Sequence, residues 1–129
     1  MKVIVAGSRS ITNAAVVAKA IAGSGFEITE LVCGGARGAD ELGRLWAQER
    51  DIPVVLFLAL WRRHGRSAGA IRNLAMARYA DALVAVWDAE SPGTRNMIDT
   101  MKALGKPVFA ICHKRCKLDD DQFQVKADA

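Results

Sequence analysis

Short runs of apolar residues alternate along the chain with longer segments in which apolar residues recur every three or four positions. The runs are rich in β-branched residues and too short for helices, so they predict strands. The expected strands are residues 2–6, 28–33, 53–58, 82–87 and 107–112. The segments between them predict helices at residues 12–23, 38–50, 68–80 and 93–104.

The predicted strands are apolar at every position rather than at alternate ones, which is typical of strands buried on both faces. Because right-handed crossovers place helices on both faces of a parallel sheet, this order predicts an α/β fold. We expect a single three-layer sandwich, formed by residues 1–112 around a mostly parallel five-stranded sheet. Residues 113–129 are weakly patterned and are expected to form a C-terminal tail or short arm.

Charge and hydropathy limit the binding partners and the cellular location expected for this domain. The formal net charge of +4 is mild and does not by itself imply a nucleic-acid partner. Five arginines nevertheless lie between residues 60 and 80, a segment without an acidic residue. No apolar run reaches the roughly 18 residues that span a bilayer, and the N-terminus lacks the apolar stretch of a signal peptide. We therefore expect a cytoplasmic protein without a membrane partner.

Several common chemistries lack their sequence signatures. Cys112 and Cys116 have C-x₃-C spacing but no second ligand pair, so no metal site is expected. The P-loop motif is absent, and "GGARGA" fails the spacing of G-x-G-x-x-G, so no dinucleotide cofactor is expected. No serine has a G-x-S-x-G setting, and no nucleophile–base pair is recognisable. Catalytic residues therefore remain unassigned.

Glycines, hydroxyls and arginines gather in the segments that follow the predicted strands. "GSRS", "GGARGAD", "ALWRRHGRSAGAIRN" and "DAESPGT" follow the first four strands, whereas the opposite turns "SGFE" and "ERDI" are plain. Ligands of parallel α/β sheets bind at the carboxyl ends of the strands, near the point where strand order reverses. This asymmetry predicts a binding site at that edge.

The segment "GGARGAD" carries the densest set of candidates. Gly34 and Gly35 would allow the backbone to approach a ligand closely. Gly38 would open a helix whose N-terminal amides hold an anion, and Arg37 adds a fork that suits phosphate. Asp40 lies in the first helical turn and could accept from a sugar hydroxyl. The alternative is a tight turn in which Asp40 only favours the helix dipole.

The first post-strand loop offers a second anion cradle. Gly7, Ser8 and Arg9 would wrap a phosphate, with the serine and the arginine as donors. The alternative is a strand-to-helix turn with an exposed arginine.

Two later segments complete the candidate site. Ser91, Gly93 and Thr94 lie at another helix start, although Thr94 could simply cap that helix. Arg72 and Asn73 lie on the preceding helix, with Arg72 near the edge of its apolar face. Such an arginine needs an anion, and the alternative is a salt bridge to a helix acid.

Four segments, "VIVAGSR", "GGARGAD", "AGAIRN" and "DALVAVWDAESPGT", resemble the SLOG superfamily in its small stand-alone YspA/cpYpsA-related branch. The resemblance covers about residues 2 to 111. It implies a Rossmann-like fold with strand order 3-2-1-4-5, in which "GSR" and "SPGT" meet. It also implies a site for a nucleotide or a nucleotide-derived ligand.

Two more distant relatives sharpen this expectation. "RNLAM" and "SPGTRNM" resemble motifs of the LOG phosphoribohydrolases and place Arg72 on their functional arginine. Their catalytic glutamate falls on Met97, which has no charge to stabilise an oxocarbenium-like sugar. Asp88, Glu90 or Asp99 would then have to replace it. The DNA-processing protein DprA shares similar glycine motifs and binds single-stranded DNA, but here only Trp61 is well placed for base stacking.

The resulting hypothesis is a protein that senses or sequesters a phosphorylated nucleotide or nucleotide-derived ligand, such as an ADP-ribose-like molecule. The alternatives are a nucleotide N-glycosidase or phosphoribohydrolase, and a single-stranded nucleic-acid binder. The relatives are commonly dimers or larger, and "IRNLAMARYA" offers an apolar helix face, so we also expect at least a homodimer.

Overall fold

The computed structural model describes residues 1–113 and 123–127. Every predicted strand and helix is present, with ends shifted by two residues or fewer. The elements are β1 (Lys2–Gly7), α1 (Ala14–Ser24), β2 (Glu30–Cys33), α2 (Ala39–Glu49), β3 (Val54–Leu56), α3 (Trp61–His64), the 3₁₀ helix η1 (Gly65–Ser67), α4 (Ala68–Tyr79), β4 (Ala82–Trp87), α5 (Pro92–Ala103), β5 (Val108–Cys112) and β6 (Phe123–Ala127).

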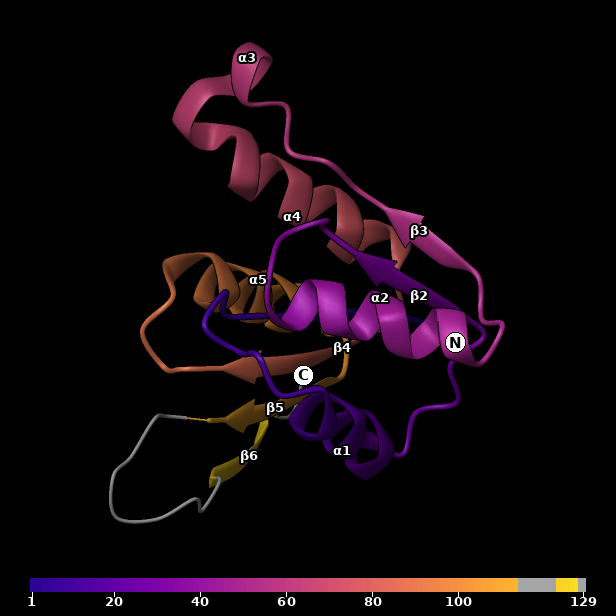
Figure 1. Cartoon of the computed structure of the whole chain (residues 1–129). Helices are drawn as coiled ribbons and strands as arrows, with labels where there is room; N and C mark the ends of the chain where they lie inside the picture. The colour runs from indigo at the N-terminus through magenta and orange to yellow at the C-terminus, as the bar shows by residue number, and fades with distance from the viewer. Residues whose placement is uncertain (114–122, 128–129) are drawn as a thin grey trace.

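The strands form one sheet in the order β3-β2-β1-β4-β5-β6 (Figure 1). The first five are parallel, so the predicted α/β class and the order 3-2-1-4-5 are confirmed. Strand β6 pairs antiparallel with β5 and comes from the segment expected to be a tail or arm. Cys116, half of the C-x₃-C spacing, lies outside the described residues.

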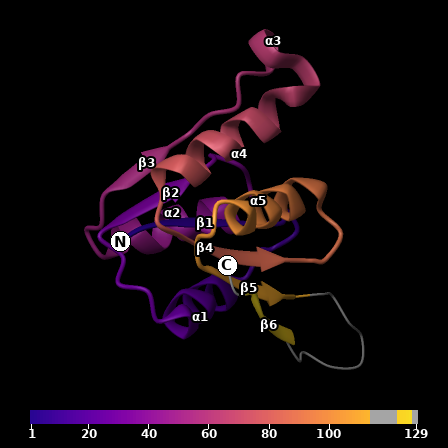
Figure 2. The same ribbon diagram turned by 180° about the vertical axis from the view of Figure 1, so that it is seen from behind.

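Two hydrophobic cores, one on each face of the sheet, explain the continuous apolar strands. In β1, Val3 and Val5 pack into the core beneath α1 and α2, whereas Ile4 and Ala6 pack into the core beneath α4 and α5. Figure 1 views the first face and Figure 2 the second. Because successive side chains of a strand point to opposite faces, burial on both sides requires an apolar residue at every position.

The core beneath α4 and α5 fixes the helices that later form the site. Met76, Met97 and Met101 are each at most 2% exposed and fill this core, as their helical spacing predicts. The amine of Lys106 donates to three carbonyl groups of residues 77–80 at 2.6–3.2 Å. A cation at these carbonyls satisfies the free end of α4 and favours its dipole.

Helix α4 turns two of its large apolar side chains outward. Ile71 and Leu74 are 44% and 36% exposed, while Asn73 and Met76 are buried against the rest of the protein. The apolar face that the predicted self-association requires is therefore available. The homodimer itself stays a prediction.

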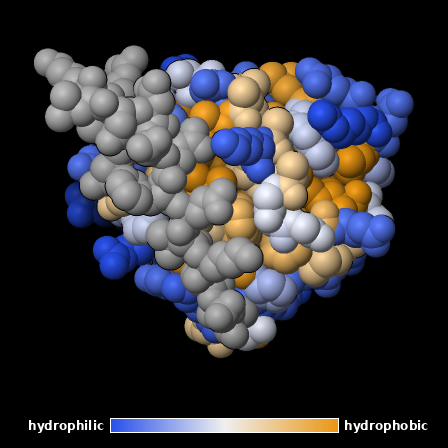
Figure 3. All heavy atoms as spheres, turned by 90° about the horizontal axis from the view of Figure 1, so that it is seen from below, coloured by the Kyte–Doolittle hydropathy of each residue, from blue (hydrophilic) through white to orange (hydrophobic). Residues whose placement is uncertain are grey.

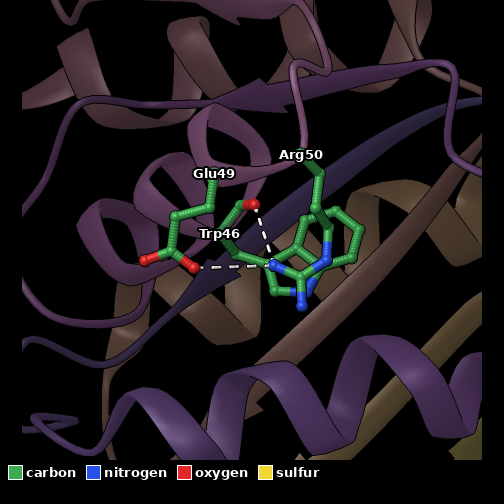
Figure 4. A network of polar contacts seen from close by, with 3 residues as sticks. All are labelled: Trp46, Glu49 and Arg50. Carbon is green, nitrogen blue, oxygen red and sulfur yellow. Dashed lines mark hydrogen bonds and ion pairs between the residues drawn. The ribbon is translucent and has the colours of Figure 1, made fainter.

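The ends of α1 and α2 show how local chemistry sets helix boundaries. The N-cap of α1 is Asn13, whose Oδ1 accepts from the backbone N–H two residues on at 2.9 Å, so the helix begins two residues later than expected. After α2, the Arg50 guanidinium lies 4.5 Å from the Trp46 ring centroid and donates to the Trp46 carbonyl (Figure 4). Its ion pair with Glu49, at 3.7 Å, is exposed and adds little stability.

The face of the molecule away from α3 and α4 carries both hydrophobic and hydrophilic residues. Seen from below (Figure 3), hydrophobic residues border the grey atoms in the middle of this face, and hydrophilic residues surround them. Within the part of the chain that the structure describes, no helix has the length and hydropathy to cross a membrane.

Candidate functional site

A pocket of about 700 Å³ lies at the carboxyl ends of β1 and β4, where strand order reverses. Its walls come from the loops after these strands, the starts of α2 and α5, and the arm, which we define as residues 61–79. The arm rises away from the sheet in Figures 1 and 2. Pockets that bind small molecules usually measure about 300–1,000 Å³, so this pocket is large enough for a nucleotide.

Most of the predicted site residues meet in this pocket. Those that line it are Gly7, Ser8, Arg9, Asp40, Arg72, Asn73, Ser91, Gly93 and Thr94. Four others do not line it: Gly34, Gly35, Arg37 and Gly38. The loops after β1 and β4 thus come together as the strand order implies, while a ligand-binding role for each residue stays a prediction.

The glycines of "GGARGAD" make room for the protein itself, which corrects their expected role of approaching a ligand. A Cβ at Gly34 would lie 2.3 Å from the Arg72 Nη1. A Cβ at Gly38, where φ is +78°, would lie 2.3 Å from the Ser8 carbonyl oxygen. At Gly35, where φ is +74°, the nearest group is a leucine side chain. These three glycines therefore pack against the protein's own groups, while Asp40 at the end of the segment lines the pocket.

Arg72 is held in place without a carboxylate partner. Its Nη1 donates to the Gly34 carbonyl at 2.8 Å, and its Nε donates to the Asn73 Oδ1 at 2.9 Å. Within residues 1–113, it forms no ion pair, so the alternative of a salt bridge to a helix acid is not observed. Asn73 in turn donates to the Gly93 carbonyl at 3.2 Å and to the Asn96 Oδ1 at 3.0 Å. The guanidinium is thus a positioned cation in the pocket wall.

Asp40 contributes an acid that resists ionisation. Its side chain is only 5% exposed, and its Oδ2 accepts from the Gly34 N–H at 3.1 Å. Burial raises the pKa of Asp40, and the Gly34 hydrogen bond and the positive charge of Arg72 only partly oppose that rise. A carboxyl of this kind repels an anionic ligand less than an exposed aspartate would.

Asp88, which the predicted set omitted, lies at the centre of the loop after β4. Its Oδ1 accepts from the backbone N–H groups of Glu90 and Ser91, both at 2.8 Å. Burial alone would raise the pKa of Asp88, but these bonds and those from the Ser8 and Ser91 hydroxyls outweigh it and hold the pKa below its ordinary value. The sequence feature that could have identified Asp88 as a site residue is its position directly after a predicted strand.

The start of α5 is organised by the same loop. Ser91 is the N-cap, yet its hydroxyl bonds Ser8 and Asp88 rather than a helix amide. Thr94 is buried inside the first turn, so the alternative of a capping threonine is not observed. The first turn of α5 therefore keeps its backbone donors available to the pocket.

The arm supplies pocket-wall residues that were not among the predicted site residues. Trp61 and Arg66 line the pocket, and Trp61 is 57% exposed. Together with Arg9 and Arg72, Arg66 gives the wall three guanidinium groups. Asn96 also lies in the wall, and nothing in the sequence except its position one turn into α5 indicated that it belongs to the site. The wall thus carries these three cationic groups beside two carboxyl groups, the buried Asp40 and the more accessible Asp88.

Comparison with known proteins identifies relatives of the chain. Residues 1–64 match the model of the YspA, cpYpsA-related SLOG family. Gene 61 protein of Mycobacterium phage D29 is 39% identical over 85 residues, which cover 61% of this chain and 68% of that protein.

The fold also matches a solved structure. The X-ray structure of DNA processing protein A (DprA) from Streptococcus pneumoniae superposes with a TM-score of 0.69 at 19% identity. The match covers 92% of this chain and 52% of that one, so the chain spans about half the length of the solved protein. At this identity, the likeness establishes the α/β fold alone.

Proposed function

The chain belongs to the YspA, cpYpsA-related SLOG family, and on that premise we propose that its pocket binds a phosphorylated nucleotide or nucleotide-derived ligand, such as an ADP-ribose-like molecule, without turning it over. The observation that carries the proposal is Arg72. Its guanidinium lines the pocket, is fixed by two hydrogen bonds and, among residues 1–113, lacks a carboxylate partner. A half-buried cation of this kind is stabilised by a bound anion.

Phosphate is the anion that the surrounding groups suit. Arg9 and Arg66 add guanidinium forks to the same wall, and such forks match phosphate oxygens. Gly93 and Thr94 lie in the first turn of α5, where backbone N–H groups and the helix dipole favour negative charge. The remaining volume accommodates a sugar and a base beside the phosphate.

The pocket lacks the group that would make it a hydrolase by the mechanism of the phosphoribohydrolases that its motifs resemble. Met97 stands where their glutamate would lie, and it is 1% exposed between the pocket and the core. A thioether neither stabilises a sugar cation nor activates water. Without a group that acts more strongly in the transition state than in the ground state, binding proceeds without catalysis.

A titration with a turnover assay tests this proposal. We expect AMP and ADP-ribose to bind in a calorimeter, and adenosine, which lacks phosphate, to bind at least about 10-fold more weakly because it loses the charge-assisted bonds. Chromatography of the same mixtures should detect no free adenine or ribose phosphate. Repeated turnovers by the wild-type chain would contradict the binding proposal and favour a hydrolase that uses Asp88.

One observation favours a second candidate, the binding of single-stranded nucleic acid. Trp61 offers an exposed ring in the same pocket wall as Arg66, and DNA processing protein A is named for its action on DNA. Stacking on an aromatic ring next to guanidinium groups suits single strands. Oligonucleotide affinity that exceeds that of AMP and falls steeply with salt would favour this candidate. Either ligand is consistent with the cytoplasmic location that we propose.

A further inference from the structure

Four side chains form a hydroxyl-rich acidic corner of the pocket, which we call the serine–aspartate cluster: Ser8, Ser10, Asp88 and Ser91. They come from the loops after β1 and β4, so the switch point of the sheet brings them together. The Ser91 hydroxyl lies 2.9 Å from the Ser8 Oγ and 3.1 Å from both oxygens of Asp88. The Ser8 Oγ accepts from the Asp88 N–H at 2.9 Å. The corner is thus rigid and built around one carboxylate.

The two carboxylate oxygens of Asp88 have different hydrogen-bond partners. Oδ1 is occupied, because it accepts from the N–H groups of Glu90 and Ser91, both at 2.8 Å. The single Ser91 hydroxyl proton lies within reach of the Ser8 Oγ at 2.9 Å and of both Asp88 oxygens at 3.1 Å, so these three acceptors share it. The Ser10 hydroxyl lies 3.5 Å from Oδ2, the limit of a hydrogen bond. An ionised carboxylate offers about four lone-pair sites, so Oδ2 keeps capacity for one good donor. Oδ1 therefore holds the loop, and Oδ2 serves the pocket.

The negative charge of Asp88 indicates which part of a ligand would donate to Oδ2. An ionised carboxylate accepts hydrogen bonds and repels phosphate, so the phosphate belongs with the guanidinium groups and the α5 amides rather than against the Asp88 Oδ2. The part of a nucleotide that joins the phosphate and carries uncharged hydroxyl donors is the sugar. Its 2′ and 3′ hydroxyls are therefore the natural partners of Asp88.

We propose that the Asp88 Oδ2 accepts a hydrogen bond from a hydroxyl of the ligand's ribose, so that the pocket selects ribonucleotides over deoxyribonucleotides. The inference rests on the proposed function and adds the sugar class to it. A ligand without that hydroxyl leaves Oδ2, in a half-buried corner, with the shared Ser91 proton and the long Ser10 contact. Sites built to bind a substrate hydroxyl reject analogues that lack it for this reason.

The test compares three probes, AMP, 2′-deoxy-AMP and 3′-deoxy-AMP, by calorimetry on the intact chain. We expect at least one deoxy analogue to bind the wild type about 10-fold more weakly than AMP, because a hydrogen bond to a charged acceptor is lost. Asp88→Asn keeps an Oδ1 for the loop amides but replaces the pocket-facing acceptor with a donor. In this variant, the preference should shrink to within about 2-fold.

Glu90→Gln is the matched control. It removes the same charge two residues away, from an exposed side chain that does not line the pocket. Its preference for AMP should equal that of the wild type. A preference that is unchanged in Asp88→Asn would assign the discrimination to another residue and overturn the inference.

Failures of the two proposals separate in the wild-type data, which need no variant to fold. If AMP binds and both deoxy analogues bind within about 2-fold of it, the sugar selectivity is refuted while the proposed function stands. If none of the three probes binds, both proposals are refuted.

Discussion

Gly7→Ala is expected to lower the free energy of unfolding by about 3 kcal/mol or more, a large share of the stability of a small domain. The added Cβ would lie 1.9 Å from the Val86 carbonyl oxygen and 2.6 Å from the Ala39 Cβ. Neither neighbour can yield easily. Val86 pairs with Gly7 in the sheet and accepts from the Ser8 N–H at 3.0 Å, while Ala39 is fully buried at the start of α2. Urea denaturation of the purified variant measures the change.

Gly93→Ala provides the control for this substitution. Gly93 also lies in a candidate binding loop, but a Cβ there would meet nothing within 4 Å. Because alanine favours a helix more than glycine does, the free energy of unfolding should change by less than about 1 kcal/mol, and the change should be stabilising. Equal destabilisation of both variants would contradict the packing explanation of Gly7.

Arg72→Ala is expected to weaken AMP binding by about 10- to 150-fold, the effect of removing about 1.5–3 kcal/mol of charge-assisted hydrogen bonding. The cation lost is the one whose position is fixed by Gly34 and Asn73 in the pocket wall. Calorimetric titration measures the change. The matched control is Arg78→Ala, which removes an exposed arginine of the same helix that does not line the pocket and should change affinity by less than about 2-fold.

Gly34→Ala tests the same cation without removing it. The Cβ would displace the Arg72 guanidinium, which lies at the end of a flexible side chain, and the φ of Gly34 is outside the left-handed region. The Cβ would also lie 3.1 Å from the buried Asp40 Oδ2, which adds a packing cost. We expect AMP affinity to fall while the free energy of unfolding drops by about 1–2 kcal/mol, less than in Gly7→Ala. If Arg72→Ala binds AMP as tightly as the wild type, phosphate is not held by this residue.

Much of the fold was readable because its signals are local and repeated. A strand such as β4, apolar at all six positions, has few alternatives to burial on both faces, and the glycine-rich loops mark where each strand ends. The helices α3 and η1 were not predicted, because the segment from Trp61 to Ser67 is only seven residues long and has no periodicity. Strand β6 was missed since its pairing with β5 depends on the sheet edge rather than on its own pattern.

The site was predicted by position more successfully than by role. Loops such as those of Ser8 and Ser91 were placed together by the topology alone. Which groups a glycine accommodates depends on side chains distant in the sequence, so Gly34 was expected to face a ligand although it faces Arg72. Asp88 was named only as a substitute acid, because its low pKa arises from four hydrogen bonds that no spacing rule anticipates.

The most direct test of the central claim, that a nucleotide binds in this pocket, is an NMR titration of the ¹⁵N-labelled chain with AMP. We expect the backbone amides of Ser8, Arg72, Asp88, Gly93 and Thr94 to shift together along one binding curve. Amides of α1, on the opposite face of the sheet, should stay in place. Absence of any shift at about 1 mM AMP, or shifts confined to surfaces away from these loops, would contradict the account.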